Sequence, residues 1–146
     1  MNHYLTERDL RSLKRAKTFE DLLKVAFRAL RRMPQPIGMV SGPISETGGL
    51  MSVEKNIDLF SRTIRQLVDK GLDIFDQMPF EEHMWRIMGN KRYYQGHDHL
   101  LRAFYKPIFE SGLIAAVHFI KGWETSFGAK WEHDLAKKLG IKIVYL

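Results

Sequence analysis

The chain of 146 residues contains no cysteine. This absence excludes disulfide bonds, thiolate metal sites and a cysteine nucleophile, and it suits the cytoplasm. The N-terminus lacks the apolar stretch of a signal peptide. The longest apolar run, residues 113–120, is interrupted by His118 and is too short to span a bilayer. We therefore expect a cytoplasmic protein that has no membrane partner.

Acidic residues are few in the N-terminal part of the chain, where basic residues outnumber them. Residues 1–36 carry nine Lys and Arg against four Asp and Glu, whereas residues 37–146 carry fourteen against thirteen. With 45% hydrophobic and 27% charged residues, the composition is typical of a globular protein. We interpret residues 1–36 as a basic N-terminal helical arm and residues 37–146 as a near-neutral α/β domain. An extended nucleic-acid footprint is not expected on the neutral part.

Apolar spacing predicts the elements of both parts. In the arm, residues 6–17 and 18–32 have helical spacing, with Thr18 as a cap and Pro34 and Pro36 beyond the end. From residue 37 onward, strands are predicted at 37–41, 72–75, 113–120 and 141–146. Helices are predicted at 52–71 and 79–88, at 99–111 with a kink or break at Pro107, and from Ser126 or Thr125 to Gly140.

This alternation of strands and helices predicts the fold class. We expect an α/β protein with a Rossmann-like (flavodoxin-like) parallel sheet of four to five strands and helices on both faces. In such sheets, ligands bind outside the carboxyl ends of the strands. The loops 42–49, 76–79 and 121–126 follow predicted strands, so substrate-binding residues are expected among Gly42, Pro43, Ser45 and Asp76.

The start of the last helix carries the residues most suited to chemistry. Free amides at a helix start favour an anion, Ser126 adds a hydroxyl, and Gly128 allows close approach of the backbone to a ligand. Glu132 lies one to two turns further on. If it faces the same cleft, its carboxylate is placed to attack an anomeric carbon. The alternative is that Glu132 is a solvated helix residue paired with a lysine.

The spacing Ser126-x-Gly128-x-x-x-Glu132-x-x-x-Ala136, followed by Gly140 and an apolar strand, resembles the nucleoside 2-deoxyribosyltransferases. It is more similar to their relatives, the nucleoside 5′-monophosphate N-glycosidases, and to an uncharacterised, DUF4406-like branch of that superfamily. The segment 39–45 also resembles the first strand and substrate loop of the family. This resemblance implies that Glu132 is the nucleophile and that Ser126 helps to hold a 5′-phosphate.

Three departures from the family pattern concern the reaction. Met39 stands where catalytic members tend to have Tyr, the segment 104–112 contains no Asp, and residues 122–124 lengthen the loop before Ser126. The missing acid would cost about 10²–10⁴-fold in rate unless another group replaces it. Asp76, Glu124 and Asp98 are open alternatives for that group.

Two further clusters have a functional and a structural interpretation. Trp123, Phe127 and Trp131 are either core residues or a platform for a base, with Trp123 the best candidate for stacking. The segment 96–99, Gly-His-Asp-His, offers too few ligands for a metal site, so no metal is expected. A histidine of that loop can instead act as an acid.

The residues and the resemblance together leave three functions open. The leading one is an N-glycosidase or deoxyribosyltransferase-like enzyme for a nucleotide or nucleoside, without a cofactor and assembled as a homo-oligomer, as the resemblance implies. The second is a non-catalytic nucleotide-binding sensor or regulatory module. The third is an interaction protein that uses the basic face of the arm, which is otherwise simply the solvated side of its helix. That face contains Lys24, Arg28, Arg31 and Arg32.

Overall fold

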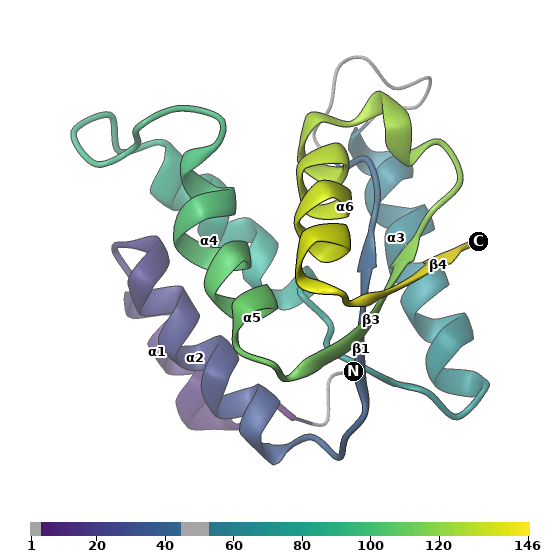
Figure 1. The fold of residues 1–146 in the computed structure, drawn as a ribbon. Helices are drawn as coiled ribbons and strands as arrows, with labels where there is room; N and C mark the ends of the chain where they lie inside the picture. The colour runs from purple at the N-terminus through teal and green to yellow at the C-terminus, as the bar shows by residue number, and fades with distance from the viewer. Residues whose placement is uncertain (1–3, 45–52) are drawn as a thin grey trace.

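A computed structural model describes residues 4–44 and 53–146 (Figure 1). Its helices and strands follow the alternation expected from the sequence. In chain order they are α1 (Glu7–Arg15), α2 (Phe19–Arg32), β1 (Ile37–Ser41), α3 (Val53–Asp69), β2 (Asp73–Ile74), α4 (Met78–Met88), the π-helix η1 (Leu101–Tyr105), α5 (Lys106–Glu110), β3 (Ile114–Phe119), the 3₁₀-helix η2 (Trp123–Thr125), α6 (Phe127–Leu139) and β4 (Lys142–Tyr145). Ser45 lies outside the described residues.

In the described part of the chain, four parallel strands form one sheet with the order β2-β1-β3-β4. β1 is central, and all five of its residues are buried. Its neighbour β3 is less covered than β1, because Ala115 is exposed and Ala116 is half-buried. The chain leaves β1 for β2 on one side and later returns to β3 on the other. The carboxyl ends of β1 and β3 therefore flank a topological switch point, where ligands bind in such sheets.

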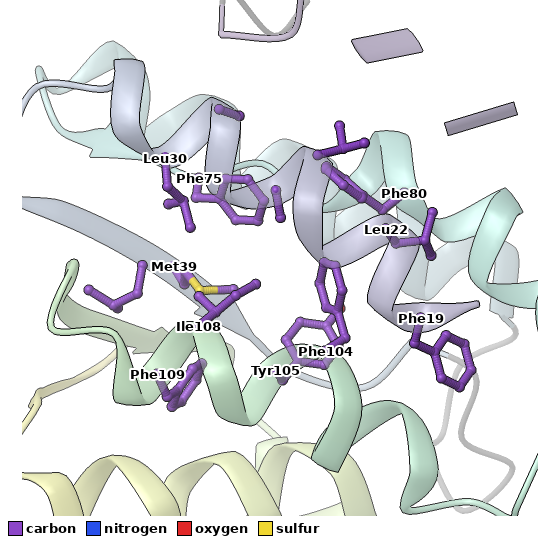
Figure 2. Packing of buried hydrophobic residues seen from close by; sticks show 14 of the residues in the cluster. Phe19, Leu22, Leu30, Met39, Phe75, Phe80, Phe104, Tyr105, Ile108 and Phe109 are labelled. Carbon is purple, nitrogen blue, oxygen red and sulfur yellow. The ribbon is translucent and has the colours of Figure 1, made fainter. Parts of the chain in front are cut away.

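Helices cover both faces of the sheet, which confirms the α/β fold class (Figure 1). On one face, α3 packs on Val40 and Ile74 through Phe60, Ile64 and Leu67. On the other face, α2, α4, η1, α5 and α6 contribute to the larger core. Figure 2 shows side chains from α2, η1 and α5 around Met39 of β1.

The helices of the predicted arm share that larger core. Phe19, Leu22, Ala26 and Leu30 of α2 are fully buried together with residues of the sheet. Leu22 and Leu30 lie beside Phe75 and Phe80, which follow β2 (Figure 2). The basic N-terminal segment is therefore an integral layer of the fold.

The local sequence signals correspond to the elements that form. Thr6 and Thr18 cap α1 and α2, each accepting a hydrogen bond from the backbone three residues on. Pro107 lies in the first turn of α5, where the preceding π-helix ends. The backbone stays helical from the π-helix into α5, so Pro107 does not break the helix, and the π-helical turn is the irregularity that precedes it. The second strand is shorter than predicted and includes only Asp73 and Ile74.

Candidate functional site

A pocket of about 310 Å³ opens at the carboxyl edge of the sheet, where the switch point lies. Residues following β1, β2 and β3 all contribute to its wall, together with α4 and η1. The described residues that line it are Gly42, Ile44, Phe60, Gln77, Glu81, Trp85, Met88, Tyr94, His97, Leu100, Leu101, Tyr105, Ser126, Phe127, Gly128, Ala129 and Glu132. The pocket thus has apolar and aromatic walls with a few polar groups, as small-molecule sites commonly do.

Glu132 faces this pocket from α6 and is only 7% exposed. This burial excludes the alternative of a solvated helix residue. Its Oε1 atom accepts a hydrogen bond of 2.6 Å from the hydroxyl of Ser41, at the end of β1. Burial raises the pKa of Glu132 to about 7, against the opposing effect of the Ser41 hydrogen bond and with a further increase from the charge of Glu81.

The start of α6 lies in the same pocket as Glu132. The Ser126 Oγ atom caps the helix by accepting a hydrogen bond of 3.1 Å from the amide of Ala129. The capping role predicted for Ser126 is therefore confirmed. Gly128 also lines the pocket, and a methyl group added there would lie 3.8 Å from the nearest atom of another element, in the Leu101 side chain. The hydroxyl at the helix start and the carboxyl within the helix face one cavity.

Glu81 is a second carboxyl group in the pocket, which the sequence did not single out. It lies in the first turn of α4 and accepts a hydrogen bond of 3.2 Å from the Trp85 indole. Burial raises its pKa to about 7, opposed by that hydrogen bond. A glutamate in a first helical turn is common for electrostatic reasons alone. The sequence therefore contained no signal that distinguishes Glu81 from its neighbour Glu82.

Two polar groups complete the floor of the site. Gln77 donates a hydrogen bond of 3.0 Å from Nε2 to the Val40 carbonyl, and its buried Oε1 atom has no hydrogen-bond partner among the described residues. The hydroxyl of Tyr105 lies near the same amide. Burial and the charges of Glu81 and Glu132 raise the pKa of Tyr105, so this hydroxyl keeps its proton at neutral pH.

Other predicted residues lie elsewhere. Gly42 lines the pocket, but Pro43 and Asp76 are not among its lining residues. The Asp76 carboxylate accepts a hydrogen bond of 2.9 Å from the Met78 amide, at the first residue of α4. Trp123 does not line this pocket either. Its indole stacks on the His133 ring of α6 with centroids 4.1 Å apart, beside Phe119 of β3.

The Gly-His-Asp-His segment separates into three different environments. His97 lines the pocket and contacts the Phe127 ring edge-on, whereas His99 is buried against Phe19. Asp98 pairs with Arg102 at 3.2 Å. Within residues 4–44 and 53–146, no group of three or more His, Asp or Glu side chains is arranged to hold a metal ion.

The basic face of α2 is partly engaged within the molecule. Arg28 and Arg32 form ion pairs of 2.9 and 2.8 Å with the fully buried Asp9 of α1. Burial raises the pKa of Asp9, but the hydrogen bonds from Arg32, the Thr6 amide and Arg28 outweigh it, and the pKa is well below its usual range. These two arginines therefore stabilise the helix pair and are less available to an external phosphate.

Fold and site together define an α/β protein with a parallel sheet and an acidic, largely apolar pocket at the carboxyl ends of its strands. Comparison with family models finds one match, to a domain of unknown function (DUF4406), over residues 98–145. The matched segment includes β3, α6 and β4, and with them Ser126, Gly128 and Glu132. No curated protein and no solved structure matches the chain. None of the described helices is long and apolar enough to cross a membrane.

Proposed function

We propose that this protein cleaves the N-glycosidic bond of a nucleoside or nucleotide, as an N-glycosidase or deoxyribosyltransferase-like enzyme with Glu132 as the nucleophile. The proposal includes membership of the nucleoside 2-deoxyribosyltransferase superfamily. One observation carries it: the buried Glu132 carboxyl faces the same pocket as the Ser126 hydroxyl and the start of α6. A sugar held at the helix start would place its anomeric carbon near that carboxylate.

The surroundings of Glu132 suit a nucleophile. The Ser41 hydroxyl donates a hydrogen bond of 2.6 Å to one carboxylate oxygen, and no described residue donates one to the other oxygen. The largely apolar walls lower the local polarity, which strengthens the interaction of a carboxylate with an oxocarbenium-like transition state. Attack on the anomeric carbon gives a glycosyl ester on Glu132. Water or a second base then resolves this ester and returns the carboxylate.

The pocket favours a nucleoside over its 5′-monophosphate. Its volume of about 310 Å³ is at the lower end of small-molecule sites, and Trp85, Tyr94 and Phe127 offer aromatic surfaces to a base. No lysine or arginine lines the described part of the pocket, whereas two glutamates do. A phosphate would therefore have the helix amides and Ser126 as donors but no cation to balance its charge.

The direct test incubates the protein with a panel of nucleosides and nucleoside monophosphates and measures the free base by liquid chromatography. We expect release by wild type and a loss of at least about 10³-fold for Glu132→Ala, since removal of a nucleophile eliminates the covalent route. Glu124→Ala, on an exposed site outside the pocket, is the matched control. Equal release by wild type and Glu132→Ala would refute the assignment of the nucleophile.

A binding-only module is the second candidate, and Met39 favours it. This side chain is buried in the core at 1% exposure, so the position supplies no hydroxyl to a ligand. Saturable binding of a nucleoside in calorimetry, without release of base over hours, is the outcome that selects this candidate. Absence of any binding would eliminate both.

A further inference from the structure

Two carboxyl groups face one pocket from different helices. Glu132 belongs to α6 and Glu81 to α4; burial raises the pKa of Tyr105, which also lines the pocket, and the charges of both glutamates raise it further. The adjacent Glu82 side chain is 83% exposed, so the direction of Glu81 into the pocket is specific to that residue. With no cation in the described lining, two negative charges here repel each other and are poorly solvated.

Such a pair keeps one proton near neutral pH, and the two environments differ in a way that assigns it. Burial disfavours the charged form of both carboxyl groups, whereas the hydrogen bond of 2.6 Å from the Ser41 hydroxyl favours the charged form of Glu132. Glu81 is only half-buried and accepts its hydrogen bond from the indole of Trp85, which is 45% exposed. The shorter hydrogen bond to Glu132 favours the proton on Glu81, whose hydrogen-bond partner Trp85 is open to solvent.

The other acids considered from the sequence do not reach the site. Asp76 accepts a hydrogen bond from the Met78 amide, Asp98 pairs with Arg102, and Glu124 is exposed; none of the three lines the pocket. His97 is the remaining competitor, since it does line the pocket. The titratable groups that face Glu81 there are Glu132 of α6, Tyr105 of η1, and Tyr94 and His97 of the preceding loop.

We propose that Glu81 is the general acid and base of the reaction, and this inference rests on the proposed function. As the Glu132 carboxylate bonds to the anomeric carbon, the bond from that carbon to the base nitrogen breaks. Its electron pair stays on the base, which takes the proton of the Glu81 carboxyl group. In the second step, the Glu81 carboxylate takes a proton from water, the water oxygen bonds to the anomeric carbon, and Glu132 leaves as a carboxylate.

The test compares leaving groups that differ in their need for a proton. 2′-Deoxyguanosine requires protonation of the base, whereas its N7-methylated cation releases a neutral base without it. Deoxyuridine and 5-fluorodeoxyuridine form the same comparison for pyrimidines, since fluorouracil is the better leaving group. Glu81→Gln should lose about 10²–10⁴-fold in kcat/KM on the ordinary nucleoside. On the activated nucleoside it should remain within about tenfold of wild type, and the alkaline limb of its pH profile should disappear.

Glu82→Gln is the matched control, because it makes the same change one residue away on the exposed side of α4. Circular dichroism and urea unfolding establish that both variants fold. Equal losses of Glu81→Gln on both substrates of a pair, or no loss on either, would overturn the role of Glu81 while leaving Glu132 and the proposed function in place. A loss found only in His97→Gln would assign the acid to His97. If wild type itself releases no base, the proposed function fails, and this inference with it.

Discussion

Replacing Glu132 by glutamine should make the protein more stable at alkaline pH. The unfolded chain releases the proton of this carboxyl near its ordinary pKa of 4.5, whereas the folded chain keeps it until about pH 7. Between these values the folded state binds more protons, so the free energy of unfolding falls as the pH rises. The stabilisation that protonated Glu132 retains at low pH is lost once the pH exceeds about 7.

The size of the effect follows from the two pKa values. The difference between 4.5 and about 7 corresponds to about 3 kcal/mol at about 1.4 kcal/mol per pH unit. Local relaxation and entry of water reduce this figure, so we expect about 2 kcal/mol. Glutamine has nearly the same shape and can still accept the hydrogen bond from Ser41 through Oε1. The substitution therefore removes the buried charge with little change in packing.

The assay is urea unfolding followed by circular dichroism at pH 5 and pH 8, for wild type, Glu132→Gln and the exposed control Glu82→Gln. The gain of Glu132→Gln over wild type should increase by about 2 kcal/mol from pH 5 to pH 8, or about 1 M in the urea midpoint. The control should show no such increase. An equal gain at both pH values, or none at pH 8, would refute the reasoning that Glu132 is buried with a raised pKa.

Three further outcomes are expected. Ser41→Ala removes the hydrogen bond that favours the Glu132 carboxylate, worth about 1.5–3 kcal/mol to a charged group, so the acidic limb of the kcat/KM profile should move up by about one to two pH units. Asp9→Asn breaks a buried ion pair and should lower the free energy of unfolding at pH 7 by about 2–3 kcal/mol. The loss is smaller than for a fully buried pair because the two arginines are partly exposed. The difference in stability from wild type should shrink as the pH falls, since acid protonates Asp9 in wild type. Gly42→Ala should destabilise the fold by about 1–3 kcal/mol, because the added methyl group would lie 2.9 Å from the side chain of the buried Ile120. At Gly128 there is space for a methyl group, so Gly128→Ala should keep the stability of wild type and weaken ligand binding.

Each of these has a control and a contrary result. Glu7→Gln, on the exposed side of α1, should leave stability unchanged, and a loss equal to that of Asp9→Asn would mean that the helix dipole explains both. If the acidic limb of the kcat/KM profile is unchanged in Ser41→Ala, the ionisation of Glu132 does not set that limb. Comparable urea midpoints for the two glycine variants would contradict the difference in available space.

The sequence alone determined the elements and much of one wall of the site. Caps at Thr6, Thr18 and Ser126 act through bonds to residues a few positions away, so their effects can be predicted locally. Ser126 and Glu132 are six residues apart at the start of one helix, so helix geometry limits where the Glu132 carboxyl can lie relative to the Ser126 hydroxyl. The alternation of strands and helices then located the pocket at the carboxyl edge.

Which residues from distant parts of the sequence line the same pocket depends on the tertiary packing of the helices. Glu81 and Glu132 are far apart in the sequence, and they meet because α4 and α6 pack around η1 at the same end of the sheet. Trp123 stacks on the His133 ring outside the pocket, and Asp9 is buried where it pairs with two arginines of the next helix. Each of these outcomes depends on how helices pack against one another, and packing is set by the combined burial of many side chains rather than by any local pattern.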